Sequence, residues 1–210
     1  MDTLEYIFNK FNLSRRARSP IEIPNYGRFQ LVNLFAELGF KVGAEIGVFK
    51  GIYAQAICKA NPTVELHLVD VWMNYADFYI SGMKGAKEEA LERLKGYNTP
   101  IHHMTSIEAA QEIPDESLDF VYIDGNHDWL HVAQDLYYWH RKVRTGGIVA
   151  GHDFKKLRKP SSNMHATSAV WGFTDAYQIK PWFLLGTRAK TPGLIRDKAR
   201  SYMWVKEPIR

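Results

Sequence analysis

The segment from Phe120 to Phe154 most constrains how this chain of 210 residues can fold. An apolar run ends in Asp124, an amphipathic segment follows, and a second apolar run ends in His152 and Asp153. The order of strand, helix and strand predicts two parallel strands, whose carboxyl ends point at the same crevice of an open α/β sheet. The polar residues at the two strand ends are therefore expected at one site.

A second unit of this kind lies upstream. Lys41 to Ile46 reads as a buried strand, and the turn E-x-G-x-x-x-G, which contains Glu45, Gly47 and Gly51, leads into a helix. The next apolar run ends in Asp70, at about the distance from the glycine turn where nucleotide-binding units carry a carboxylate for the ribose hydroxyls. Glycines let the backbone approach a ligand, and the helix N-terminus offers oriented N–H groups. The pattern predicts a nucleoside ligand.

The same turn argues against a nicotinamide cofactor. Val48 stands where the second glycine of G-x-G-x-x-G permits contact with a pyrophosphate. A nucleoside ligand without a pyrophosphate fits this turn better.

Alternating strands and helices predict an α/β fold with a mainly parallel sheet in a single domain, residues 1–210. Ser106 is the expected cap of a helix that reaches Ile113. Trp182 to Gly186 and Tyr202 to Val205 are expected to form an antiparallel edge. Residues 1–26 are expected to form an N-terminal arm, and residues 155–165 a mobile loop beside the site.

Composition limits the class of protein. The chain is 46% hydrophobic and 24% charged, as is usual for a soluble globular protein, and it contains no apolar run near the roughly 18 residues of a membrane span. These features predict a cytoplasmic protein without a membrane partner. The formal charge of +4 is mild, so a nucleic-acid partner is not expected, whereas a homo-oligomer is compatible with the sequence. Cys58, the single cysteine, allows no internal disulfide.

Four motifs together resemble the class I S-adenosylmethionine-dependent methyltransferases. They are the E-x-G-x-x-x-G turn, the strand end V-D-V-W at Asp70, the segment I-D-G-N-H-D-W and the closing G-H-D-F. The nearest subgroup is the small family related to macrolide-sugar O-methyltransferases and cephalosporin methylation proteins. The resemblance covers Lys41 to Phe154 and implies a Rossmann-like fold, with a mostly parallel seven-stranded sheet, helices on both faces and an antiparallel edge.

The resemblance also implies a cofactor site for S-adenosylmethionine. Glu45, Gly47 and Gly51 would surround the methionine part, and Asp70 would bind the ribose hydroxyls. The resemblance also implies that Ser106 and Ile107 lie near the adenine. Asp124, at the end of its strand, would also contact the cofactor.

The resemblance further implies a divalent cation, with Asp124, His152 and Asp153 as its ligands. Relatives that bind a metal carry a carboxylate at the position of His152. Oxygen ligands suit magnesium, whereas an imidazole shifts the preference toward manganese, zinc or iron. Magnesium or manganese is therefore the expected ion. Alternatively, His152 orients Asp153 or contacts the substrate. The alternative to a bound cation is a structural role for the three residues at the strand ends.

His127 falls where relatives that methylate sugars place a general base. A cation would lower the pKa of a hydroxyl, and a neutral imidazole then accepts its proton near neutral pH. The alternative for His127 is an exposed position at the start of a helix, beside the cap candidates Asn126 and Asp128.

The chain is thus expected to be an O-methyltransferase in which His127 and Asp124 are catalytic. The expected acceptor is the hydroxyl of a small molecule, either a sugar or a glycosylated compound. Two other functions stay open: a non-catalytic cofactor-binding module of the same fold and a nucleotide-dependent dehydrogenase. The spacing of Asp124 and His127 argues against the first, and Val48 argues against the second.

Overall fold

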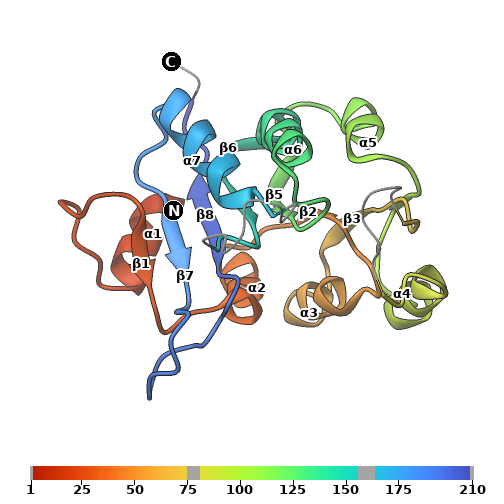
Figure 1. The fold of residues 1–210 in the computed structure, drawn as a ribbon, viewed down its shortest axis with the longest axis horizontal. Coiled ribbons are helices and arrows are strands. Elements are labelled where there is room, and N and C mark those ends of the chain that lie inside the picture. Colours follow the sequence, from red (N-terminus) through yellow and green to blue (C-terminus); the bar gives the residue numbers. More distant parts are fainter. Residues whose placement is uncertain (1, 75–80, 156–163, 209–210) are drawn as a thin grey trace.

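The computed structural model describes residues 2–74, 81–155 and 164–208. Within these residues, the chain forms an eight-stranded sheet with the order β1-β7-β8-β6-β5-β2-β3-β4 (Figure 1). The strands are β1 (Ile21–Ile23), β2 (Val42–Ile46), β3 (Glu65–Val69), β4 (Ile101–His102), β5 (Leu118–Ile123), β6 (Val143–Gly151), β7 (Phe183–Leu185) and β8 (Ser201–Val205).

Most neighbouring strands of the sheet are parallel. The exception is β8, which runs antiparallel to both β6 and β7. The predicted mostly parallel sheet is therefore confirmed, and its seven predicted strands are joined by an eighth, β1. This strand lies within the predicted N-terminal arm and pairs parallel with β7. Its three residues, between Pro20 and Pro24, are too few to show a strand periodicity in the sequence.

Helices cover both faces of the sheet, as predicted (Figure 1). On one face, α1 to α4 pack with Phe120 and Tyr122, while α5 to α7 pack on the other face with Val121 and Ile123. The alternation follows from the period of two along β5. The helices are α1 (Thr3–Lys10), α2 (Arg28–Glu37), α3 (Ile52–Ala60), α4 (Ala86–Leu94), α5 (Ser106–Glu112), α6 (Trp129–Lys142) and α7 (Ala166–Ala176). None of them combines the length and the apolar character needed to cross a membrane.

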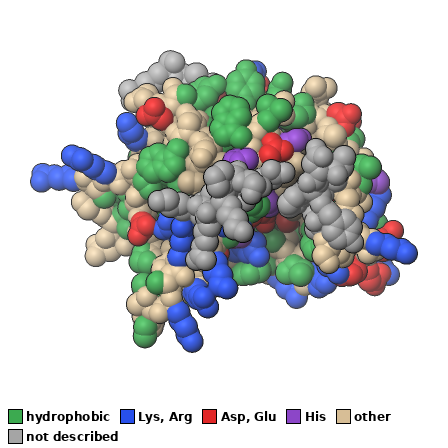
Figure 2. Space-filling view, in the orientation of Figure 1, with side chains coloured by type: hydrophobic (Ala, Val, Ile, Leu, Met, Phe, Trp, Pro, Cys, Tyr) green, Lys and Arg blue, Asp and Glu red, His purple; other side chains and the backbone are tan. Residues whose placement is uncertain are grey.

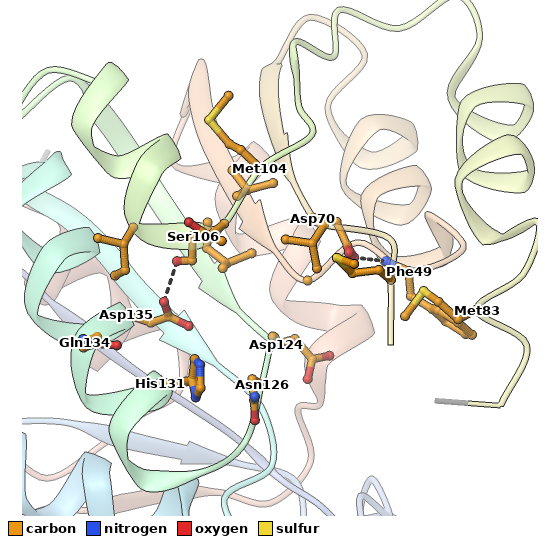
Figure 3. Close-up of a pocket in the computed structure, with 18 residues that line it drawn as sticks. Phe49, Asp70, Met83, Met104, Ser106, Asp124, Asn126, His131, Gln134 and Asp135 are labelled. Atoms are coloured by element: carbon orange, nitrogen blue, oxygen red, sulfur yellow. Dashed lines mark hydrogen bonds between the residues drawn. The ribbon is translucent and has the colours of Figure 1, made fainter. Parts of the chain in front are cut away.

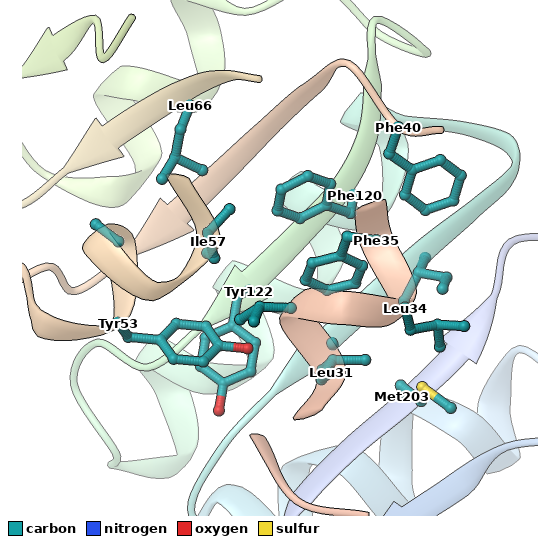
Figure 4. Packing of buried hydrophobic residues seen from close by; sticks show 14 of the residues in the cluster. Leu31, Leu34, Phe35, Phe40, Tyr53, Ile57, Leu66, Phe120, Tyr122 and Met203 are labelled. Atoms are coloured by element: carbon teal, nitrogen blue, oxygen red, sulfur yellow. The ribbon is translucent and has the colours of Figure 1, made fainter. Parts of the chain in front are cut away.

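Aromatic stacking fixes α2 against the sheet (Figure 4). The rings of Phe35 and Phe120 stack with their centroids 4.1 Å apart, and Phe40 extends the stack. A Cβ at Gly43, on the neighbouring strand, would lie 2.2 Å from the Phe120 ring. Glycine at this position of β2 is therefore needed for the stack to form.

The loop expected beside the site falls partly outside the described residues. Of residues 155–165, only the two ends are described.

Ser106 has a different role from the predicted one. Thr105 is the N-cap of α5, and Glu108 completes a capping box by accepting a hydrogen bond from the Thr105 N–H. Ser106 begins the helix, and its hydroxyl donates to the carboxyl group of Asp135 on α6. The same hydroxyl accepts a hydrogen bond of 2.7 Å from Trp139 Nε1. Ser106 thus joins α5 to α6, and burial raises the pKa of Asp135 to about 7.

We predict that Asp135→Asn removes a pH-dependent loss of stability. The pKa of Asp135 in the folded protein lies above its ordinary value of 3.8, so the folded state binds more protons than the unfolded chain between pH 3.8 and about 7. The free energy of unfolding therefore falls as the pH rises through this window, by about 4 kcal/mol at most. Asparagine still accepts from Ser106 but does not ionise.

Thermal melts from about pH 4 to about pH 8 test this prediction, since the variant should melt higher than the wild type only at the alkaline end. Asp175→Asn, at an exposed position of α7, is the matched control. Parallel profiles for Asp135→Asn and the wild type would contradict the prediction.

Candidate functional site

Three neighbouring strands bring the predicted polar residues together. Ile46 of β2 pairs with Ile123 of β5, and Ile123 pairs with Gly151 of β6. The residues that follow therefore leave the sheet side by side. Asp124 donates its backbone N–H to the Ile46 carbonyl at 2.8 Å, and His152 donates to the Ile123 carbonyl at 3.0 Å.

Gly47 makes this approach possible. Its φ is +88°, and a Cβ on it would lie 2.3 Å from the carbonyl oxygen of Asp124. Gly51, the second glycine of the turn, has φ +70° and caps α3. A Cβ at Gly51 would meet Ala90 of α4 at 3.1 Å. Gly47 thus serves the site, whereas Gly51 lets α3 and α4 pack closely.

Asp70 holds the glycine turn in place. Its Oδ2 accepts a hydrogen bond of 2.8 Å from the Phe49 N–H, and its Oδ1 accepts one of 2.7 Å from the Trp72 N–H. Phe49 and Trp72 both have positive φ, so the carboxylate stabilises two strained loop residues. A carboxylate offers about four acceptor positions, which leaves capacity for further donors.

Two cavities meet at these strand ends. The first cavity has a volume of about 280 Å³, and Asp70, Met104, Ile107 and Asp135 are among the residues that line it. Figure 3 shows Asp70 with Phe49 on one side of it and the Ser106–Asp135 pair on the opposite side.

The second cavity has a volume of about 500 Å³, and Arg28, Glu45, Tyr53 and His127 line it. Four residues line both cavities: Gly47, Phe49, Asp124 and Gly125. Both cavities therefore border Asp124.

The predicted cofactor residues divide between the cavities. Asp70, Ser106 and Ile107 line the first, Glu45 lines the second, and Gly47 and Asp124 line both. Gly51 is not among the described residues that line either cavity.

Glu45 is a buried acid at the second cavity. Its side chain is 2% exposed, and its Oε2 has no hydrogen-bond partner among the described residues. Burial, together with the negative charges of Asp124 and Asp70, holds the pKa of Glu45 well above its ordinary value. A positively charged ligand group would lower this pKa and supply the missing partner.

The predicted cation ligands form a compact group. One ligand atom each from Asp124, His152 and Asp153 lies within 4.8 Å of the others. His127 Nε2 lies 3.2 Å from Asp153 Oδ2, so the predicted base borders the same carboxylate. Lys155 also pairs with Asp153, at 2.8 Å.

Charges of opposite sign shift the pKa values in this group. Burial lowers the pKa of His152, but its ion pairs with Asp153 and Asp197 and the charge of Asp124 outweigh burial and raise the pKa to about 9. For Asp153, burial is outweighed by His152, His127 and Lys155, which hold its pKa well below the ordinary range. Burial raises the pKa of Asp124, although the two histidines oppose the shift.

Two residues of the site were not predicted from the sequence. Arg28 Nη1 lies 3.4 Å from Asp124 Oδ2, and Asp197 Oδ2 lies 3.4 Å from His152 Nε2. Arg28 begins α2, and Asp197 belongs to the segment between β7 and β8. Neither follows a predicted strand of the parallel sheet, so no motif marked them.

Solved structures share this fold at low sequence identity. The N-methyltransferase NodS from Bradyrhizobium japonicum WM9 has a TM-score of 0.59 and 13% identity, with 86% of this chain and 94% of that chain covered. An O-methyltransferase from Bacillus cereus, in complex with SAH, has a TM-score of 0.60 and 14% identity, with 98% and 91% covered. The fold is that of class I methyltransferase structures.

Sequence comparison gives the family. The uncharacterized protein y4gI of Sinorhizobium fredii (strain NBRC 101917 / NGR234) is 26% identical over 121 residues, which are 54% of this chain. The match spans only 12% of that relative's length. A family model described as a methyltransferase domain matches residues 44–154, from β2 to the residue after Asp153. Because the match covers more than half of the sequence, the chain belongs to this family of methyltransferase domains.

Proposed function

We propose that this protein is an S-adenosylmethionine-dependent O-methyltransferase that uses a divalent cation and methylates a hydroxyl of a sugar or glycosylated small molecule. The main support is the position of Asp124, which lines both cavities and shares the second one with the predicted base His127. One cavity can then hold the nucleoside and the other the reacting groups. The family match and the SAH-bound relative support the cofactor.

The residues of the two cavities fit this cofactor. Asp70, at the rim of the first cavity, has acceptor positions for the ribose hydroxyls, and the apolar side chains of Met104 and Ile107 suit the adenine. In the second cavity, the unpartnered oxygen of Glu45 suits the ammonium of the methionine part. Gly47, without a Cβ, lets the glycine turn approach the backbone of Asp124 closely. A cofactor held by these residues would have its sulfonium near Asp124.

Methyl transfer requires a positioned acceptor and a group that takes its proton. The acceptor oxygen attacks the methyl carbon, the bond from carbon to sulfur breaks, and the hydroxyl proton passes to a base. His127 lines the second cavity and has Asp153 against its Nε2. A carboxylate on one ring nitrogen orients the ring and favours a lone pair on the other, which is the arrangement of a general base.

The group of Asp124, His152 and Asp153 fits a divalent cation. It offers two carboxylates and one imidazole within 4.8 Å, a mixed oxygen and nitrogen set that suits manganese and admits magnesium. A cation bound there would lower the pKa of the acceptor hydroxyl. Asp153 would contact both the cation and His127, so it would link the two.

The rim of the second cavity suits an acceptor that contains a ring. Phe29 and Ile52 line it, although 46% and 54% of their surfaces are exposed. Apolar side chains exposed at a cavity rim are typical of a ligand site, and flat aromatic surfaces suit the faces of sugar rings. A sugar or glycosylated compound is therefore the proposed acceptor. A cytoplasmic location, a homo-oligomer and the subgroup that acts on macrolide sugars remain proposals based on the sequence.

We predict that Glu45→Gln binds the cofactor more weakly. Glutamine keeps the volume of the side chain but loses the charge that would pair with the ammonium, so the affinity for S-adenosylhomocysteine should fall roughly ten- to a hundredfold. Titration calorimetry measures the change. Glu92→Gln, on the exposed face of α4, is the control and should bind like the wild type. If the wild type binds neither S-adenosylmethionine nor its demethylated product, the proposed function is wrong.

If a cation takes part in the reaction, methyl transfer should depend on added metal. Chelator-treated protein should bind Mn²⁺ at one site, as measured by paramagnetic resonance with S-adenosylhomocysteine present, and Asp153→Asn should weaken this binding about tenfold or more. Methyl transfer should stop on chelation and return with magnesium or manganese. Full activity in the chelated protein would remove the cation from the mechanism.

His127→Ala should separate chemistry from binding. We expect turnover to fall roughly 10²- to 10⁴-fold, the usual contribution of a general base, while the affinity for S-adenosylhomocysteine is retained. Formation of S-adenosylhomocysteine over a panel of sugars and glycosides measures turnover, and calorimetry serves as the internal control. A variant that turns over like the wild type would exclude His127 as the base.

A further inference from the structure

A third cleft adjoins the second cavity, with a volume of about 300 Å³. The first turn of α2 lines one side, and the segment between β7 and β8 lines the other. Arg28 lines both this cleft and the second cavity, so the cleft opens beside the candidate reaction centre. We call it the arginine cleft. Its lining residues are Gly27, Arg28, Phe29, Gln30, His152, Ile195, Arg196 and Asp197.

The N-terminus of α2 lies in this cleft, and its N-cap residue has no side chain, although Gln30 Oε1 accepts a hydrogen bond of 3.0 Å from the Gly27 N–H. Gly27 is the N-cap, and a Cβ there would lie 2.7 Å from the Cγ2 atom of Ile195. Because Ile195 approaches so closely, glycine is favoured at the N-cap. A glycine cap leaves the N–H groups of Arg28 and Phe29 without a side chain from the N-cap residue. First-turn N–H groups lack partners within the helix, and the positive end of the helix dipole adds to their attraction for an anion.

Arg28 brings a second set of donors to the cleft. Its one ion pair within the described residues, to Asp124, is long at 3.4 Å. Its side chain is 32% exposed, and the guanidinium lies over the rings of Phe29 and Tyr53. Because a guanidinium carries five N–H donors, the contacts with Asp124 and Tyr122 leave further donors for a ligand.

The segment that contributes the opposite wall is rich in basic residues, of which Arg196 lines the cleft. Between β7 and β8, residues 186–200 contain one acidic residue, Asp197, and five basic ones: Arg188, Lys190, Arg196, Lys198 and Arg200. Arg196 lines the cleft, is exposed, and forms no ion pair with any described residue. In Figure 2, Lys and Arg side chains gather in the lower part of the view, on and beside this segment. Such a rim attracts anions from solution.

His152 forms part of the cleft wall. Its side chain is 10% exposed, and its Nε2 makes no hydrogen bond among the described residues, although Asp197 forms an ion pair with it. The Asp197 carboxylate lies 3.4 Å away but outside hydrogen-bond geometry. Among the lining residues, the two guanidinium groups of Arg28 and Arg196 face one carboxylate, that of Asp197, which leaves an excess of positive charge.

We propose that the methyl acceptor is an anion, a hydroxyl compound whose carboxylate or phosphate group binds in the arginine cleft between Arg28, Arg196 and the first turn of α2. The guanidinium groups and the helix N–H groups are donors that match such oxygens. An anionic group held there places the rest of the acceptor in the second cavity, beside His127 and Asp124. The inference rests on the proposed function, since it names the class of acceptor for the same site.

Calorimetry with small anions tests the cleft directly. Chelator-treated protein at low salt is titrated with inorganic phosphate, with glucuronate and with neutral methyl glucoside, each with and without S-adenosylhomocysteine. We expect saturable binding of an anion and none of the neutral sugar. Stronger binding of glucuronate than of phosphate would assign a carboxylate, and the reverse order would assign a phosphate.

Matched variants locate the binding. Arg196→Gln and Arg28→Lys should each weaken anion binding about tenfold, because a charge-assisted contact is lost or loses its bidentate geometry. Lys198→Gln removes an equal charge from an exposed neighbour that does not line the cleft, and it should change binding little. Arg196 is exposed, so its variant is expected to fold even if Arg28→Lys does not.

The outcomes separate the two proposals. Protein that binds S-adenosylhomocysteine but no anion contradicts the anionic acceptor and leaves the methyltransferase proposal standing. Protein that binds an anion at this cleft but no S-adenosylhomocysteine contradicts the proposed function instead. Equal loss of binding in Arg196→Gln and Lys198→Gln would show attraction by general charge and overturn the assignment to the cleft.

Discussion

The site depends on the close approach of β2 and β5 at their carboxyl ends. Gly47 leaves β2 with φ +88°, and the carbonyl of Asp124 occupies the place where a Cβ would be. Any larger residue at this position would push the glycine turn away from β5 and separate the two cavities that meet at Asp124. Asp70 then fixes the far side of the turn through Phe49. The backbone conformation of Gly47 thus determines the shape of the whole candidate site.

Side chains of opposite charge lie together at these strand ends, and their ion pairs affect how a cation would bind. His152 lies within 3.7 Å of three carboxylates, those of Asp124, Asp153 and Asp197, which favour its charged form. A metal ligand must instead be a neutral imidazole. Binding of the proposed divalent cation would therefore release a proton from His152 and bring two positive charges, in place of one, among the same carboxylates. Without a cation, the imidazole of His152 pairs with these three acids.

The sequence predicted the parts of the fold and site that follow from periodicity. Asp124, His152 and Asp153 end apolar runs, and neighbouring parallel strands must end at one edge, so their meeting could be predicted without coordinates. Ser106 was misassigned as a cap because its neighbour Thr105 has the same capping chemistry. Asp197 could not be found at all, because it belongs to an irregular segment whose position depends on tertiary pairing. Periodicity predicts which residues end strands, but it does not predict which loops return to them.

The unpredicted strand β1 explains how Arg28 reaches the site. Since β8 runs antiparallel to β6, its first residues lie beside the carboxyl end of β6, where Tyr202 pairs with Gly151. β7 is antiparallel to β8 and β1 is parallel to β7, so both end at that same edge. The chain leaving β1 enters α2 there, and the segment leaving β7 packs against it through the hydrogen bond from the Ile195 N–H to the Pro24 carbonyl, 2.9 Å long. The arginine cleft is therefore a consequence of strand order: adding one short strand to the edge of the sheet brings the start of α2 and a basic loop to the end where the ligand residues lie.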